Sequence, residues 1–138
     1  GYDALSTVYS PPDASEGLFE LAGLWLPARE ASGGQCLEVG LAWRALASTD
    51  VSYRVYLHLL DAEGRLVAQD DGEPAAWSRP TTGWATGEVV SEMRRVTLPE
   101  DAEPGRYTLR VGLYEEQGPR LQTVEGDDGA VLATITVR

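Results

Sequence analysis

The residues best suited to ligand binding are tryptophans in a stretch that lacks periodicity. Residues 71–87 follow neither a strand nor a helix pattern, and they contain Trp77 and Trp84. Exposed aromatic rings stack on the apolar faces of sugar rings, while a few polar neighbours fix the orientation of the ligand. The expected carbohydrate-binding residues are therefore Trp77, Arg79, Trp84 and Glu88. The alternative for Trp84 is a packing role in which its ring holds the loop against the core.

Residue types that perform catalysis are few. His58 is the one histidine, it lies inside a predicted strand, and no Gly-x-Ser-x-Gly elbow accompanies it. Cys36 is the one cysteine, and we interpret it as a small buried residue at the start of a strand. A Cys36–His58 dyad would require an exposed, ionised thiol. We expect no catalytic residue, and the domain itself is not expected to be an enzyme.

Acidic residues are abundant, but their spacing matches no established site. Segments 69–73 and 125–129 each contain an aspartate pair within or beside a predicted turn, where carboxylates remain hydrated. Both segments offer oxygen ligands to Ca²⁺, although neither has the EF-hand spacing. No phosphate-binding glycine loop precedes a helix. We expect no metal site and no cofactor, and structural calcium remains an alternative for these two loops.

Length and charge limit the kind of partner. The chain has 138 residues and a formal net charge of −11 at pH 7, and all its basic residues are arginine. Nucleic acids and anionic membrane surfaces are bound by positively charged surfaces, so we expect neither as a partner. No apolar stretch approaches the length of a membrane span, so no segment is expected to insert into a bilayer. One domain is predicted over residues 1–138.

Strand periodicity recurs along the whole chain. Alternation of apolar and polar residues, with turn signals between segments, is typical of an antiparallel sandwich. The predicted strands lie at residues 2–9, 18–26, 36–46, 51–60, 65–69, 88–98, 104–114, 119–124 and 131–137. We predict an all-β, antiparallel Ig-like β-sandwich of about seven to nine strands, with a jelly-roll sandwich as the alternative topology. Trp25 and Trp43 lie within strands and are expected to pack in the core.

The segment Pro104–Tyr114 carries the clearest structural signal. Pro104 and Gly105 form a turn, Tyr107 begins a strand, and Leu109 to Leu113 continue the alternation on the same face. A tyrosine at this place is typical of the tyrosine corner of Ig-like sandwiches. We therefore expect Tyr107 to face inward and its hydroxyl to bond to the backbone of the preceding connection. These residues are assigned a structural role.

Four segments of the chain carry a family resemblance. They are Tyr53–Pro74, Pro80–Val90, Leu98–Pro99 and Pro104–Tyr114. The most specific elements are Trp84-x-x-Gly87-Glu88 and Pro104-Gly-x-Tyr107. The set resembles the C-terminal soluble domain of bacterial multi-pass membrane glycosyltransferases of the dolichyl-phosphate-mannose mannosyltransferase-like class. The layout is also similar to the polysaccharide-binding C-terminal domain of O-antigen exporters and to small proteinase-inhibitor sandwiches.

The resemblance implies an accessory role. In that glycosyltransferase class the catalytic acids lie in the membrane-embedded part, so no catalytic residue is carried over to this chain. The implied domain is a fragment of a longer membrane protein, lies on the extracytoplasmic side of a bacterial membrane, and contacts its parent membrane domain and a glycan or acceptor. Weak glycan binding is the expected activity.

Two other functions remain open. A structural or protein-interaction module would expose an apolar patch or an unprotected edge strand, for which residues 131–137 are the candidate. A proteinase inhibitor would need a rigid protruding loop, which residues 71–87 could supply.

Overall fold

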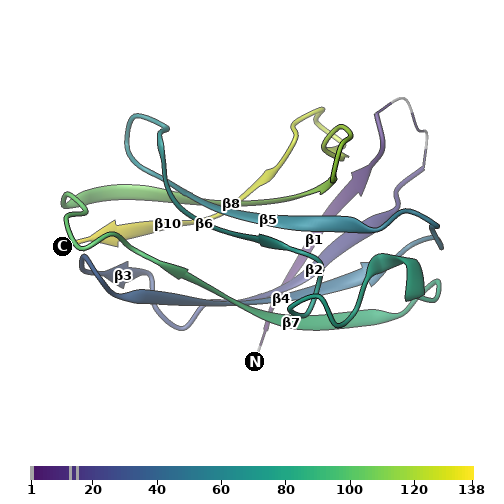
Figure 1. The fold of residues 1–138 in the computed structure, drawn as a ribbon, viewed down its shortest axis with the longest axis horizontal. Helices are drawn as coiled ribbons and strands as arrows, with labels where there is room; N and C mark the ends of the chain where they lie inside the picture. Colours follow the sequence, from purple (N-terminus) through teal and green to yellow (C-terminus); the bar gives the residue numbers. More distant parts are fainter. Residues whose placement is uncertain (1, 13, 15) are drawn as a thin grey trace.

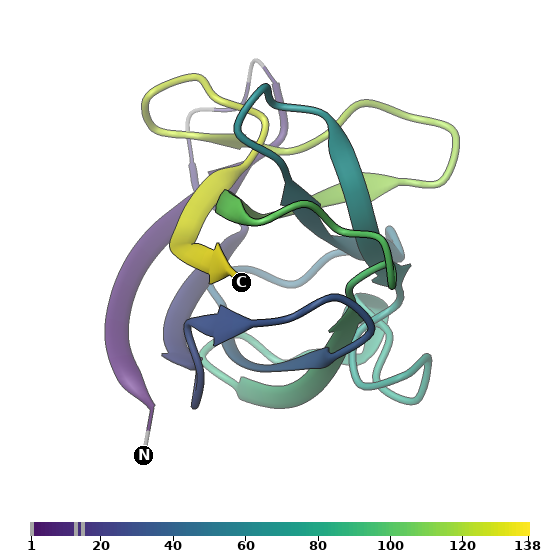
Figure 2. The ribbon, with the colours of Figure 1, turned by 90° about the vertical axis from the view of Figure 1, so that its left-hand side faces the viewer.

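Two five-stranded sheets pack face to face and form the whole fold (Figures 1 and 2). The computed structural model describes residues 2–12, 14 and 16–138. The lower sheet of Figure 1 has the order β7-β4-β2-β1-β9, and the upper sheet has the order β3-β10-β8-β5-β6. The predicted all-β sandwich is confirmed.

The elements alternate with turns along the chain. The strands are β1 (Asp3–Ser10), β2 (Phe19–Trp25), β3 (Glu30–Ala31), β4 (Cys36–Ala45), β5 (Tyr53–Leu60), β6 (Leu66–Gly72), β7 (Val89–Thr97), β8 (Gly105–Glu115), β9 (Gln122–Thr123) and β10 (Ala130–Val137), with one 3₁₀ turn, η1 (Thr81–Gly83). Pairing between them is antiparallel except for β3 with β10. Across the described residues, no helix has the length and apolar character needed to cross a membrane.

The core lies between the sheets and follows the alternation of the sequence. On β5, the side chains of Tyr53, Val55, Leu57 and Leu59 are buried, as predicted from their period of two. Apolar side chains from both sheets complete this core and include Trp43, which is fully buried. Burial of this apolar surface is the main force that holds the two layers together.

The tyrosine corner is confirmed. Tyr107 at the start of β8 is 5% exposed, and its hydroxyl donates a hydrogen bond of 2.7 Å to the backbone carbonyl of Glu103. Gly105, two residues earlier, has a φ of 151°, a value that residues with a side chain rarely adopt. The Pro104–Gly105 turn and Tyr107 therefore fix the entry of the chain into β8, which lies between β10 and β5 in the upper sheet.

Three expectations about individual residues are corrected. Cys36 is exposed at the first position of β4, so it is not a buried packing residue. Trp25 pairs in register with Gly40 and is only partly buried, because an irregularity between Leu21 and Gly23 shifts the register of β2 and reverses which side chains point inward. The expected edge strand, β10, lies inside the upper sheet, although β3 pairs only with its last two residues.

Candidate functional site

A left-handed turn follows the end of β6 and presents Trp77. Ala75, Ala76 and Trp77 have φ values of 54°, 54° and 72°. For residues other than glycine this conformation costs about 1–2 kcal/mol per residue, so consecutive examples persist only where the surrounding structure imposes them. Backbone bonds close the turn, from Trp77 N to the Glu73 carbonyl and from Arg79 N to the Pro74 carbonyl, each 3.2 Å.

The buried carboxylate of Glu92 on β7 holds this turn in place. Glu92 is 4% exposed, and its Oε1 accepts hydrogen bonds from the backbone N–H of Ala75 at 3.0 Å and from Nε of Arg94 at 2.9 Å. Its Oε2 accepts a bond of 2.6 Å from the indole Nε1 of Trp43 in the core. Both carboxylate oxygens are therefore satisfied, which is the condition under which a buried charge is tolerated.

The partner of Glu92 closes the same network on the β6 side. Arg94 is 5% exposed and donates from Nη2 to the carbonyls of Gly72 at 2.9 Å and Glu73 at 3.3 Å, and from Nη1 to the carbonyl of Asp70 at 3.4 Å. The guanidinium thus occupies the free edge of β6 and joins it to β7 in the other sheet. We call Glu92 and Arg94 the buried ion pair.

The indole of Trp77 lies on the turn with about half of its surface free. Trp77 is 52% exposed, and the guanidinium carbon of Arg54 lies 4.9 Å from the centre of its ring. A Cβ atom at Gly72 would come within 2.9 Å of Trp77 Nε1, so this glycine lets the ring approach the end of β6. The ring is therefore held on one side by the protein and remains available to a ligand.

A small pocket opens beside the indole. It has a volume of about 160 Å³, and its lining includes Asp70, Asp71, Trp77 and Met93. Asp70 Oδ2 lies 3.8 Å from Arg94 Nη1, while Asp71 lies 3.5 Å from both His58 Nε2 and the Tyr114 hydroxyl. All three contacts are long, so the two carboxylates retain acceptor capacity. We call this set, with Glu73 at its rim, the Trp77 pocket.

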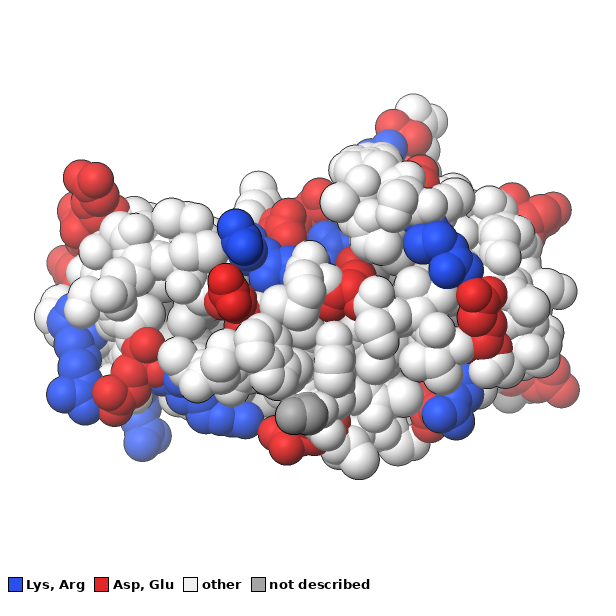
Figure 3. Space-filling model, turned by 90° about the horizontal axis from the view of Figure 1, so that it is seen from below, with Lys and Arg blue, Asp and Glu red and all other residues white. Residues whose placement is uncertain are grey.

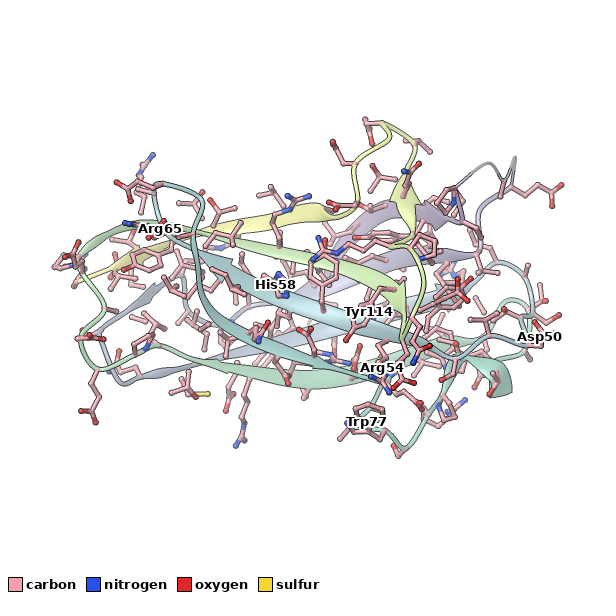
Figure 4. All side chains as sticks on the ribbon, turned by 45° about the horizontal axis from the view of Figure 1, so that its top comes forward. Asp50, Arg54, His58, Arg65, Trp77 and Tyr114 are labelled. Atoms are coloured by element: carbon pink, nitrogen blue, oxygen red, sulfur yellow. The ribbon has the colours of Figure 1, made fainter. Side chains whose placement is uncertain are left out.

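Polar side chains extend the site across the outer face of the upper sheet. Figure 4 shows Trp77, Arg54, Tyr114 and His58 following one another along this side of the molecule. Burial lowers the pKa of His58 below its ordinary value, and the nearby Asp71 carboxylate partly opposes this shift. Burial and the Asp71 charge raise the pKa of Tyr114. The imidazole of His58 and the phenol of Tyr114 are therefore both uncharged near neutral pH.

Trp84 lies apart from this surface. It is 3% exposed, its ring meets Phe19 edge to face with centroids 5.4 Å apart, and its Nε1 donates to the carbonyl of Arg79 at 3.0 Å. An indole buried in this way cannot offer a face to a sugar. The expectation of Trp84 as a binding residue is corrected, and its alternative role in holding the loop against the core is the one the structure shows.

Arg79 and Glu88 neutralise one another. Arg79 Nη2 and Glu88 Oε2 are 2.6 Å apart, and Glu88 Oε1 accepts a bond from the N–H of Ala85 at 3.0 Å. These bonds hold the pKa of Glu88 below its usual range. Neither residue lines the Trp77 pocket. The structure therefore divides the expected site, with Trp77 on the exposed turn and Arg79, Trp84 and Glu88 in the connection that follows.

Apart from Trp77, the pocket residues were not among the carbohydrate-binding residues expected from sequence. Asp70 and Asp71 belong to a predicted turn in the sequence interpretation, whereas the structure places both on β6. Glu92 and Arg94 carry a usable signal, because they occupy the inward phase of a strand whose other inward residues are Val90 and Val96. Charges at inward positions of an alternating strand indicate a buried polar network.

Catalytic and metal-binding arrangements are not formed by the candidates named above. Cys36 lies on β4 of the lower sheet and His58 on β5 of the upper sheet, so they do not form a dyad. Within residues 2–12, 14 and 16–138, no group of three His, Cys, Asp or Glu side chains is arranged to hold a metal ion.

No family model and no curated protein matches the chain, but solved structures share its fold. The C-terminal domain of Wzt is similar with a TM-score of 0.60 at 14% identity, over 94% of this chain and 80% of that one. A Niemann-Pick type C2 protein from Japanese carpenter ant has a TM-score of 0.58 at 4% identity, over 99% and 96%.

Part of a DNA glycosylase is also similar. The alkylpurine DNA glycosylase AlkC of Pseudomonas fluorescens, bound to DNA with an abasic site analogue, has a TM-score of 0.55 at 15% identity, over 87% of this chain and 30% of that one. At such identities the similarities show a common β-sandwich fold, and fold alone does not assign a function.

Proposed function

We propose that this chain is a non-catalytic, glycan-binding β-sandwich domain whose binding site is the Trp77 pocket. The observation that carries the proposal is the half-exposed indole of Trp77, held on a left-handed turn by the buried ion pair beside two underused carboxylates. Aromatic rings stack on sugars, and carboxylates accept hydrogen bonds from sugar hydroxyls. Trp77 and Asp70 line one pocket, while the carboxylate of Asp71 lies beside His58 and Tyr114 on the outer face of the upper sheet.

The strained backbone of residues 75–77 supports a functional role for this turn. Left-handed non-glycine residues cluster at binding sites, where the surrounding structure maintains them. Here the buried ion pair and the indole of Trp43 form the hydrogen-bond network that holds the turn, and the turn places Trp77 at the surface. A loop with only a connecting role would not require this support.

The wider role follows from the resemblance of the sequence. A domain of this kind serves as the accessory part of a bacterial membrane glycosyltransferase on the extracytoplasmic side, where it contacts the glycan or acceptor and the parent membrane domain. The fold common to this chain and the C-terminal domain of Wzt supports a non-catalytic β-domain. The affinity expected is weak, because a pocket of about 160 Å³ encloses only one sugar substituent and leaves most of a glycan in solvent.

Titration with bacterial glycan fragments tests the proposal. Tryptophan fluorescence of the wild type should change with glycan concentration, and the change should disappear in Trp77→Ala. Trp25→Phe provides the matched control, since Trp25 lies on the lower sheet and its loss should leave the response intact. Equal fluorescence responses in wild type and Trp77→Ala would show that Trp77 is not part of the binding site. No fluorescence change with any glycan of a broad panel would overturn the glycan-binding function.

A protein-interaction module is the second candidate, favoured by the outer face of the lower sheet. Tyr2, Val89 and Met93 are 42%, 47% and 50% exposed, and Tyr2 lies over Gly23 and Gly40. Figure 3 shows this face from below, with uncharged residues over much of its middle. Self-association or binding of the parent membrane domain through this face should be weakened by Met93→Glu, as measured by light scattering. A strict monomer that binds no partner would count against it.

A further inference from the structure

The outer face of the lower sheet has the surface and the charge pattern of an interface, and we infer that it binds a second copy of this chain in a two-fold symmetric dimer. The face is formed by β7, β4, β2 and β1, which are neighbours in the lower sheet. The inference rests on the protein-interaction function, whose partner it specifies, and it does not depend on glycan binding.

The middle of this face is apolar and nearly flat. Met93 and Tyr2 are 50% and 42% exposed, and uncharged surface covers much of the middle of the face in Figure 3. A Cβ atom at Gly40 would come within 2.9 Å of the Tyr2 hydroxyl and 3.2 Å of Met93 Sδ, and one at Gly23 would come within 3.2 Å of the Tyr2 ring. The two glycines therefore let these side chains lie close to the sheet, which leaves a surface that a second sheet can pack against.

Charged side chains on this face balance one another. Those that β2, β4 and β7 direct outward are Glu20, Glu38, Arg44 and Arg95. Two are negative and two are positive, although the whole chain has a net charge of −11. Two copies of this acidic protein can therefore meet through this face without bringing an excess of negative charge into the contact.

These charges remain available to a partner. At one end of the face Arg95 Nη2 lies 3.7 Å from Glu38 Oε1, and at the other end Arg44 Nη1 lies 3.7 Å from Glu20 Oε1. Both contacts are too long for good hydrogen bonds. The side chains of Glu38 and Arg44 are 44% and 47% exposed, so each can form a further ionic contact.

The spacing of Glu38 and Arg44 fits a two-fold axis. Both point outward from β4, about 20 Å apart, and Leu41 is midway between them. An axis that crosses the strands at Leu41, in the plane of the interface, sets β4 antiparallel to β4 of the second copy. Glu38 then faces Arg44 of the second copy, and Arg44 faces its Glu38. One surface thus supplies both partners of two identical ionic contacts, as a two-fold interface requires.

The geometry of sheet packing allows these contacts to form. Sheets that pack face to face lie about 10 Å apart, with their strands inclined by about 30°. At about 10 Å from the axis, this inclination displaces the facing residues by about 5 Å, which the long side chains of arginine and glutamate can span. Met93 lies near the axis, since it pairs in register with Gly40, and it would pack against the apolar middle of the second copy.

The size of the face sets the strength of the dimer. A strand of 10 residues such as β4 is about 33 Å long, and four paired strands are about 14 Å wide. The resulting area of about 460 Å² is below the roughly 800 Å² per partner of a standard stable interface. We therefore expect a weak dimer, with a dissociation constant on the order of 100 μM.

Charge reversal with rescue tests the inference. In sedimentation experiments from about 10 μM to about 1 mM, wild type should dimerise, and Glu38→Arg or Arg44→Glu should each weaken dimerisation at least about tenfold, because each places like charges at both ionic contacts. The double variant Glu38→Arg with Arg44→Glu should restore dimerisation, since it exchanges the charges and keeps the pairing. An equimolar mixture of the two single variants should form a heterodimer, because each ionic contact between the two variants joins an arginine to a glutamate.

General charge repulsion predicts a different result. Glu38→Arg changes the net charge from −11 to −9, which would strengthen association if repulsion between whole molecules controlled it. Glu125→Arg makes the same change at an exposed residue between β9 and β10, and it should leave the dissociation constant within about twofold of wild type. Thermal melting shows whether each variant is folded.

The outcomes separate the dimer from the other functions. Dimerisation of wild type, the double variant and the mixture, but of neither single variant, would support the two-fold arrangement. Wild type that stays monomeric at about 1 mM would overturn the dimer, leave the face to the parent membrane domain and leave glycan binding unaffected. Folded single variants that dimerise like wild type would overturn the arrangement, and so would a double variant or a mixture that stays monomeric.

Discussion

Replacement of Arg94 by methionine should destabilise the fold and release the Trp77 turn. Methionine fills a similar volume but leaves the carboxylate of Glu92, which is 4% exposed, without its ionic partner. The carbonyls of Gly72 and Glu73 also lose their donor. The expected effect combines an unpaired buried charge with unsatisfied backbone groups.

The magnitude follows from that burial. Removal of one partner of a buried ion pair costs about 3–5 kcal/mol, a large part of the stability of about 5–15 kcal/mol typical of a domain. For a domain of this length each kcal/mol corresponds to about 2–4 °C, so the melting temperature should fall by about 10 °C. Arg95→Met is the matched control, since Arg95 is on the same strand but its side chain is 73% exposed, and it should change stability by less than about 0.5 kcal/mol.

A double variant separates stability from positioning. Glu92→Gln with Arg94→Met removes both charges and should recover about half or more of the lost stability, because no buried charge is left unpaired. Glutamine has one acceptor oxygen for the two donors that Glu92 bonds, the backbone N–H of Ala75 and the indole N–H of Trp43, so the N–H of Ala75 should exchange with solvent faster than in wild type. Urea unfolding and amide hydrogen exchange give the two readings. A single variant as stable as wild type, or a double variant no more stable than the single, would refute this reasoning.

Other consequences follow from individual side chains. Trp84→Ala should destabilise the protein by about 3–5 kcal/mol, as expected for a buried tryptophan, whereas Trp77→Ala should lose glycan binding with little change in urea midpoint. Tyr107→Phe should cost about 1 kcal/mol in the same assay, and no loss would deny the hydrogen bond to the Glu103 carbonyl a stabilising role. His58 has a lowered pKa in the folded state, so the unfolded chain binds the proton more readily, and stability should fall as the pH is lowered through about 6.5. His58→Gln should flatten that pH dependence between about pH 7.5 and 5.5, and an unchanged slope would assign it to other groups.

The parts of the fold that were predictable depend on local pattern. The alternation of β5 and the turn before Tyr107 depend only on residues adjacent in sequence, and both predictions are correct. Trp25 was not, because a register irregularity in β2 reverses its phase and this depends on pairing with β4. The exposure of Cys36 likewise depends on whether another segment of the chain covers the first residue of β4. The sequence of β4 alone does not specify this.

The site was less accessible to sequence reasoning for a related reason. Trp77 and Trp84 are seven positions apart in one aperiodic stretch, and only the tertiary structure makes one exposed and the other buried. The Trp77 pocket forms where β6 of one sheet meets β7 of the other, and Asp70 and Met93 lie far apart in the chain. Contacts between distant segments carry no signature in residue spacing. The inward charges of β7 were the available signal.

The central claim is that glycans bind at the exposed indole of Trp77. Indole N–H resonances in a nitrogen–proton NMR spectrum report each tryptophan separately during titration with a binding glycan. The Trp77 resonance should shift progressively, while those of Trp43 and Trp84, whose N–H groups are bonded to Glu92 and to the Arg79 carbonyl, should stay in place. A glycan that binds without moving the Trp77 resonance would contradict the account.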